Sequence, residues 1–288
     1  MGVRAKGARS TQPPPQPSPG VPGEGVQPTR TLLTPPAHPT SIDYTQLTTD
    51  NSPTLHGLVI ETSGRIGSVA ITADGIVIAE DSFEHGLRHA AEMIPRIDRL
   101  ARDRGLTPAD LREIYVSVGP GSFTGLRIGI TAAKTISFAT GALIAAVPTV
   151  EVLAANAPAE ALNVIVLLDA KRGQVFTARL ARANAAEEWQ AIEPAHLDSL
   201  SAILSRSPRP VHLIGEGIAY HQQDIPTNDA GVIVTGPELW RARAAATAKL
   251  GRQLLRDGHA VDAQQLTPLY IRKPEAQEKA ESAARIGS

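Results

Sequence analysis

The sequence predicts an α/β fold of two lobes, each with a mixed β-sheet flanked by helices. Two observations carry this prediction. In the first half, an apolar strand runs into a glycine-rich turn, a helix and a second strand, which is the crossover unit that joins parallel strands. The second half opens, like the first, with a hairpin around an acidic residue, although no repeat is visible in the sequence itself.

Short apolar strands open the first half. They are expected at 58–60, 68–71 and 76–79. The pair Asp74-Gly75 between the last two is a strong hairpin signal. A helix is expected from about Leu87 to Arg104, because apolar residues recur there at spacings of three and four, and Gly105 ends it.

The crossover unit follows. It comprises a strand at 114–118, a glycine-rich turn at 119–125, a helix at 123–140 and a strand at 143–147. In the second half, strands are expected at 164–168, 174–180 and 211–214, and a helix from about Pro237 to Arg256 closes the fold.

Composition excludes several classes of protein. The 288 residues carry 28 Lys and Arg against 29 Asp and Glu, a formal charge of -1, which argues against a protein that coats nucleic acid or acidic membranes. The absence of cysteine excludes disulfide scaffolds, iron–sulfur clusters, Cys-type zinc sites and thiol nucleophiles. Aromatic residues make up only 3%, which disfavours base-stacking platforms for single strands. Apolar runs are too short for a membrane helix.

Four segments are expected along the chain. They are a disordered proline-rich extension at 1–53, a first lobe at 54–158, a second lobe with the closing helix at 159–274, and a flexible tail at 275–288. The extension holds 11 of the 23 prolines and few residues that could form a core. Because no secretory apolar region or amphipathic presequence is visible, we expect a cytoplasmic protein.

The segment Gly119–Gly129 allows two interpretations. Its glycines permit a sharp turn into a helix whose free N–H groups could bind phosphate, with Ser122 or Thr124 as the cap. It lacks the Lys-Ser/Thr ending of a Walker A loop. The helix that follows has a flat face of small residues, which fits either tight packing inside the chain or close approach of a partner helix.

Histidines and serines give weak signals. His85 and His89 have metal-ligand spacing, but no Glu follows His85 and no third ligand lies nearby, so two solvated histidines are the simpler interpretation. Ser122 lacks the surroundings of a nucleophile elbow.

Acidic and basic residues give further candidates. Glu61 and Asp169 each follow an apolar strand, as the metal- and phosphate-binding acids of actin-like ATPases and sugar kinases do, but acids at turns are common. Four basic residues of the closing helix share a quarter of its circumference and could contact RNA phosphates or simply face solvent; they are Arg241, Lys249, Arg252 and Arg256.

Together these segments resemble the TsaB (YeaZ) family, the dimerization subunits of the bacterial tRNA threonylcarbamoyladenosine transferase complex. The most specific match is the block Gly119-Pro120-Gly121-Ser122-Phe123-Thr124-Gly125-Leu126-Arg127. Supporting matches, in family order, are 58–63, 89–97, 169–176 and 268–272. The resemblance covers about Leu55 to Pro274.

The resemblance implies an actin-like (ASKHA, Gcp/TsaD-like) fold and a function in a complex. The complex would transfer threonylcarbamoyl from threonylcarbamoyl-AMP to N6 of the adenosine beside the anticodon in tRNAs reading ANN codons. Catalysis would belong to the partner TsaD, joined by the ATPase TsaE, and tRNA would be met through the complex. Thr149 and Leu153 stand where TsaD proteins have a metal-binding histidine pair, so no metal is expected here.

The resemblance also implies site residues. The expected partner interface is Met93, Ile97, Ile128, Gly129, Ala132 and Lys134, on an exposed pair of helices. The candidates for nucleotide binding, with ATP or ADP at the partner interface, are Glu61, Ser63, Asp169, Arg172, Gly215 and Gly217.

Two departures and two alternatives accompany the resemblance. Family members often have Asp at Glu61 and Glu at Gln174, so independent ATP chemistry is less expected.

The alternatives are a stand-alone ASKHA-type phosphotransferase or metallopeptidase-like enzyme, and a homodimeric binding module that uses the same helices.

Overall fold

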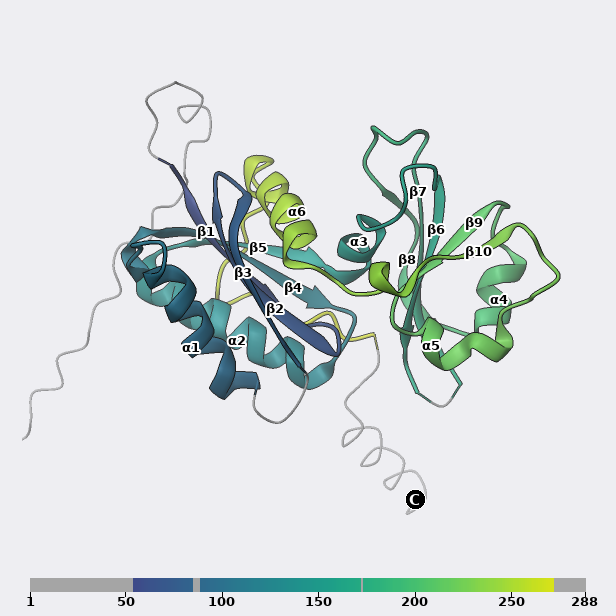
Figure 1. Cartoon of the computed structure of the whole chain (residues 1–288), viewed down its shortest axis with the longest axis horizontal. Helices are drawn as coiled ribbons and strands as arrows, with labels where there is room; N and C mark the ends of the chain where they lie inside the picture. Colours follow the sequence, from purple (N-terminus) through teal and green to yellow (C-terminus); the bar gives the residue numbers. More distant parts are fainter. Residues whose placement is uncertain (1–53, 85–88, 172, 272–288) are drawn as a thin grey trace, which may run out of the picture. The chain divides into compact units, whose positions relative to one another are not determined.

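The computed structural model describes residues 54–84, 89–171 and 173–271. These residues form ten strands, arranged in two sheets, and six α-helices (Figure 1). The expected extension at 1–53, the tail at 275–288 and His85 lie outside these residues, as do the side chains of His89 and Ala90.

The first sheet contains the strands expected in the first half. They are β1 (His56–Glu61), β2 (Ile66–Ala73), β3 (Ile76–Glu84), β4 (Leu111–Gly119) and β5 (Leu143–Pro148). The order is β3-β2-β1-β4-β5, with antiparallel pairing of β1, β2 and β3 and parallel pairing of β1 with β4 and of β4 with β5. The expected hairpin and crossover unit are therefore confirmed.

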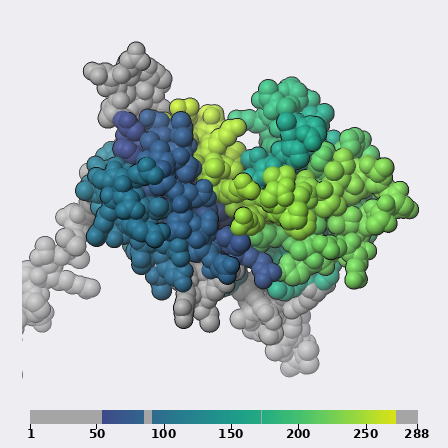
Figure 2. All heavy atoms as spheres, viewed as in Figure 1, coloured from purple at the N-terminus to yellow at the C-terminus, as the bar shows by residue number. Residues whose placement is uncertain are grey.

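Helices cover both faces of the first sheet. α1 (His89–Arg102) and α2 (Phe123–Thr140) lie side by side on one face, and α6 (Ala244–Arg256), from the far end of the sequence, packs on the other (Figure 1). Because side chains alternate along a strand, Leu58 and Ile60 of β1 pack with α1 and α2, whereas Val59 packs with α6. In Figure 2 the yellow-green closing segment lies directly against the blue first sheet.

The second sheet repeats the topology of the first. Its strands are β6 (Asn163–Asp169), β7 (Val175–Ala181), β8 (Gln190–Asp198), β9 (Val211–Ile214) and β10 (Val232–Val234), in the order β10-β9-β6-β7-β8. As β1 does in the first sheet, β6 pairs antiparallel with the strand that follows it, β7, and parallel with a later strand, β9. β7 in turn pairs antiparallel with β8. The predicted α/β fold with two mixed sheets is thus confirmed, and the duplication suggested by the sequence is visible in the strand order.

Short helices accompany the second sheet: α3 (Thr149–Ala154), α4 (Leu200–Ser205) and α5 (Ile218–His221). α3 belongs to the predicted first lobe, but Val150 and Leu153 pack in a cluster with strands β6 and β7. α6 belongs to the predicted second lobe but packs on the first sheet. The predicted segment boundaries stay predictions.

The closing helix begins later than the sequence suggests. A 3₁₀ turn spans Pro237–Leu239, and α6 starts only at Ala244. Between them the chain is held by its own contacts, since Trp240 Nε1 donates to the Thr235 carbonyl and Asn156 Nδ2 donates to the Arg241 carbonyl. The expected helix start at Pro237 is wrong because these contacts tie residues 240–243 into an irregular path.

Candidate functional site

Four of the six expected interface residues lie inside the chain's own core. Met93 is 1% exposed, Ile97 7% and Ala132 8%, and all three pack with β1 and β2. Gly129 is also buried, and a Cβ there would collide with Thr62 Oγ1, in the residue that follows β1. The expectation that these residues face a partner is wrong, because the periodic face of each helix is the one that covers the sheet. Ile128 and Lys134 are half-buried.

The opposite side of the same two helices faces solvent and carries two large apolar side chains. Ile94 is 47% exposed and Phe138 55% exposed. We call six uncharged exposed residues of this side the outer helical face: Ala91, Ile94, Pro95, Thr131, Thr135 and Phe138. Their spacing of three and four along each helix places them on one stripe per helix, and α1 and α2 are neighbours. Charged residues are exposed on the same two helices as well: Asp98, Arg99, Arg102 and Arg127.

The glycine-rich turn before α2 is packed and capped from within. Ser122 Oγ accepts from the Gly125 N–H, and the Ser122 N–H donates to the Ser63 carbonyl. A Cβ on Gly121 would also meet the backbone of Ser63. The structure therefore supports the interpretation in which this segment packs tightly inside the chain. Beside it, the Arg127 guanidinium stacks on the Phe123 ring at 3.8 Å.

Glu61 is sealed in the interior and its carboxylate is fully engaged. Oε1 accepts from the Ser63 N–H at 2.8 Å and from the Ser117 hydroxyl at 2.9 Å, and Oε2 accepts from Thr247 Oγ1 of α6 at 3.2 Å. Burial raises the pKa of Glu61 above its ordinary value, and these hydrogen bonds partly oppose the rise. Ser63 is buried too. Neither residue is accessible to a nucleotide, so this expectation is wrong for both.

The described ones among the remaining nucleotide candidates lie at the ends of strands of the second sheet or in the turns after them. Gly215 and Gly217 are buried, and a Cβ on either would strike the backbone of Leu167 in β6. Close packing on that strand, not ligand approach, explains both glycines. Asp169 accepts from the Lys171 N–H at the turn after β6. Arg172 lies outside the described residues.

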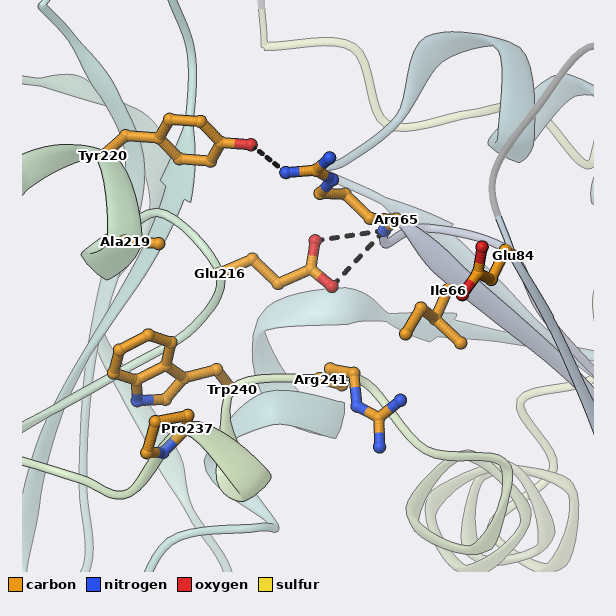
Figure 3. A pocket seen from close by; sticks show the side chains of 9 residues that line it. All are labelled: Arg65, Ile66, Glu84, Glu216, Ala219, Tyr220, Pro237, Trp240 and Arg241. Carbon is orange, nitrogen blue, oxygen red and sulfur yellow. Dashed lines mark hydrogen bonds between the residues drawn. The ribbon is translucent and has the colours of Figure 1, made fainter.

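A pocket of about 390 Å³ lies elsewhere, and none of the five described candidates lines it (Figure 3). Its lining residues are Arg65, Ile66, Glu84, Glu216, Ala219, Tyr220, Pro237, Trp240 and Arg241. At its centre the Glu216 carboxylate accepts from the Arg65 backbone N–H at 3.0 and 3.3 Å, and Arg65 Nη1 donates to the Tyr220 hydroxyl. Burial raises the pKa of Glu216. Sequence reasoning singled out its two flanking glycines but missed Glu216 itself.

The position of the TsaD histidine pair holds packing residues. Thr149 and Leu153 lie one turn apart on α3, and each is 1% exposed. Within the part of the chain that the structure describes, no three His, Asp or Glu side chains gather as they would around a metal ion.

The basic stripe expected on the closing helix is interrupted by burial. Arg252 is 8% exposed, and its guanidinium lies 3.3 Å from Asp74 and 3.6 Å from Glu113. It therefore anchors α6 to the first sheet, and the expectation that Arg252 faces RNA or solvent is wrong. Among the described helices, none is long and apolar enough to cross a membrane.

Comparisons with known proteins agree with the fold and the motifs. Residues 84–280 match the family model described as TsaD, tRNA N6-adenosine threonylcarbamoyltransferase. The Bacillus subtilis tRNA threonylcarbamoyladenosine biosynthesis protein TsaB is 32% identical over 225 residues, which cover 77% of this chain and 96% of the relative. The Escherichia coli protein of the same name is 27% identical, with the same shares covered.

Solved structures show the same fold. The Pseudomonas aeruginosa protein described as similar to peptidase YEAZ superposes with a TM-score of 0.65, at 22% identity, over 76% of this chain and 100% of that one. A second structure, YeaZ from Pseudomonas aeruginosa, has a TM-score of 0.62 over 75% and 99% of the two chains. The resemblance drawn from the glycine-rich block is confirmed: the chain belongs to the TsaB (YeaZ) family of tRNA threonylcarbamoyladenosine biosynthesis proteins.

Proposed function

We propose that this chain is a non-catalytic scaffold subunit in the synthesis of threonylcarbamoyladenosine on tRNA, and that its outer helical face binds a TsaD subunit. TsaD would perform the transfer of threonylcarbamoyl to N6 of the adenosine beside the anticodon, with TsaE as the associated ATPase. The tRNA would be met through the complex, in the cytoplasm. Family membership supports the pathway.

The observation that carries the docking surface is the exposure of two large apolar side chains on adjacent helices. Fully burying a side chain such as Ile94 or Phe138 contributes about 1.5–3 kcal/mol, and part of this offsets the cost of association. The threonines between them are short and uncharged, so a partner helix can approach without burying an unpaired charge.

The positions of two sets of residues support the proposal that this chain does not itself catalyse the transfer. Thr149 and Leu153, which are both buried and offer no imidazole, stand where a metal-binding pair would stand in TsaD proteins. Glu61 is enclosed by Ser63, Ser117 and Thr247. ATP or ADP would accordingly bind at the surface shared with TsaD and not within this chain alone.

The test replaces Phe138 by Arg and Ile94 by Asp, singly, and measures the affinity for purified TsaD by calorimetry. Both side chains point to solvent, so each variant should keep its melting temperature while affinity falls by at least about tenfold, the equivalent of 1.4 kcal/mol. Ile76→Arg is the matched control, since Ile76 is 70% exposed on the edge strand β3, away from the outer helical face.

Unchanged affinity in both variants, with the fold intact, would remove the assigned surface. Transferase activity of this chain without TsaD, metal retained by the purified chain, or ATP turnover without partners would support the enzyme alternative instead. Size-exclusion chromatography of the same variants without TsaD tests whether the homodimer uses this face.

A further inference from the structure

A second pocket, of about 320 Å³, lies where the chain enters α6. It is lined by Ile66, Gly67, Ser68, Glu80, Ser82, Arg241, Ala242 and Arg243. It shares Ile66 and Arg241 with the pocket of Figure 3 but contains none of the residues of the Arg65–Glu216 contact. Its volume is at the lower end of the range of small-molecule sites.

Ser68 gives this pocket an unsatisfied polar group. The residue is 5% exposed, and its hydroxyl has no hydrogen-bond partner among the described residues. Ser68 is two residues before Ala70, which packs with α6, so the alternation of β2 directs its side chain to the same face as the helix. A buried hydroxyl without a partner costs free energy, which a ligand that accepts its hydrogen bond would recover.

The start of α6 adjoins the pocket, because its N-cap residue Arg243 belongs to the lining. The helix has 13 residues, its N-cap is Arg243 with no side-chain cap, and no acidic residue lies in its first turn. The first N–H groups of a helix lack intrahelical acceptors and carry the positive end of the helix dipole. Glu61 reaches this end from the interior, but its contact is with the Thr247 hydroxyl, one turn into the helix.

Two arginines add positive charge. Arg241 is exposed and lines both pockets. Burial raises the pKa of Glu216, and the charge of Arg241 partly opposes that rise. Arg243 Nη2 donates to the Glu238 backbone carbonyl at 2.6 Å. A guanidinium has five N–H groups, so others remain for a ligand. Glu80, exposed on β3, is the acidic residue of the lining. The pocket is therefore positively charged beside α6, at Arg241 and Arg243, and negatively charged at the edge strand β3.

We propose that this pocket binds the phosphoryl group of a small molecule, held by Ser68, Arg241 and Arg243, with Glu80 and Ser82 facing the rest of the ligand. Guanidinium groups and hydroxyls are donors that bind phosphate in proteins. The inference does not depend on the proposed function, because it concerns this chain alone and a surface distinct from the outer helical face.

The experiment titrates the full chain by calorimetry with two probes, inorganic phosphate and AMP. Binding of both identifies a phosphate site, and tighter binding of AMP shows that the pocket also contacts the part of the ligand beyond the phosphoryl group. Ser68→Ala and Arg241→Gln should each weaken binding by about tenfold, as expected when a charged hydrogen bond is lost. Arg256→Gln, at the opposite end of α6, is the matched control and should bind like the wild type.

Melting temperatures separate binding from folding. Ser68→Ala should melt at or above the wild-type temperature without ligand, because the substitution removes an unpaired buried hydroxyl. A lower melting temperature would mean that the hydroxyl has a structural partner and would overturn its role here. Absence of binding of either probe at millimolar concentration, or binding that both site variants leave unchanged, would overturn the proposal.

Discussion

The carboxylate of Glu216 accepts a hydrogen bond from the backbone N–H of Arg65, 151 residues earlier in the chain. The two residues come from different sheets: Arg65 precedes β2 of the first, and Glu216 follows β9 of the second. Together with the contact between Arg65 and the Tyr220 hydroxyl, this bond ties the β1–β2 turn to the segment after β9. The Glu216 carboxylate therefore satisfies the backbone N–H of Arg65.

We predict that Glu216→Ala speeds hydrogen exchange at the Arg65 amide by tenfold or more. Hydrogen bonds that involve a charged group contribute about 1.5–3 kcal/mol, and this one protects the amide directly. Glu84→Ala is the control, since Glu84 lines the same pocket and does not contact that amide. Amide exchange followed by NMR measures both, and equal protection in Glu216→Ala and wild type would contradict the assignment.

Glu61 should make stability depend on pH. Burial raises its pKa in the folded protein, so folding takes up a proton between the ordinary carboxyl pKa and the raised value. Stability is therefore greatest below the ordinary pKa and falls as pH rises through the raised one. Burial also raises the pKa of Glu151 and Glu216, which adds to the same trend.

In Glu61→Gln the decline with pH should be shallower. The amide oxygen can still accept from Ser63 and Ser117, and the NH₂ group can donate to Thr247 Oγ1. Urea unfolding at several pH values from about 5 to 8 measures the slope. A slope that is equal or steeper in the variant would show that Glu61 is not the titrating group.

Gly129→Ala should destabilise the protein, although Gly→Ala in an exposed helix usually stabilises it by about 1 kcal/mol. The sign reverses because the new Cβ would meet Thr62 Oγ1 and, at 3.1 Å, Ile60 Cγ2. Overpacking of this kind costs about 1–3 kcal/mol. Thr131→Ala, on the exposed side of α2, is the control and should change stability little. Denaturant unfolding checks both, and a stabilised Gly129→Ala protein would place this glycine at the surface.

Gly215→Ala should cost more than Gly173→Ala. Both glycines have a positive φ, +121° and +71°, which side chains other than glycine adopt at a cost of about 1–2 kcal/mol. A Cβ on Gly215 would also strike the Leu167 carbonyl, whereas nothing lies within 4 Å of one on Gly173. The difference between the two unfolding free energies reports the collision together with the greater backbone strain at +121°. Equal losses would mean that Gly215 does not pack on β6.

Much of the fold could be predicted locally. The hairpin at Asp74-Gly75 and the crossover through Gly119–Gly129 depend on turn chemistry and alternation, which neighbouring residues determine, and both are confirmed. Strand β8 escaped prediction because it contains Pro194 and is half-exposed, so its alternation is weak. The late start of α6 escaped as well, because the Arg241 carbonyl before it is held by Asn156, 85 residues earlier in the chain.

The sequence by itself determined the family, through the glycine-rich block, and most of the strands and long helices, through periodicities that act over a few residues. Only the tertiary structure decided which side of α1 and α2 meets solvent, that the Glu61 carboxylate is enclosed, and that Ser68 and Arg241 line one pocket. The physical reason is that burial depends on what covers a residue. An apolar stripe such as Met93 and Ile97 reads the same in sequence whether its own sheet or another subunit covers it.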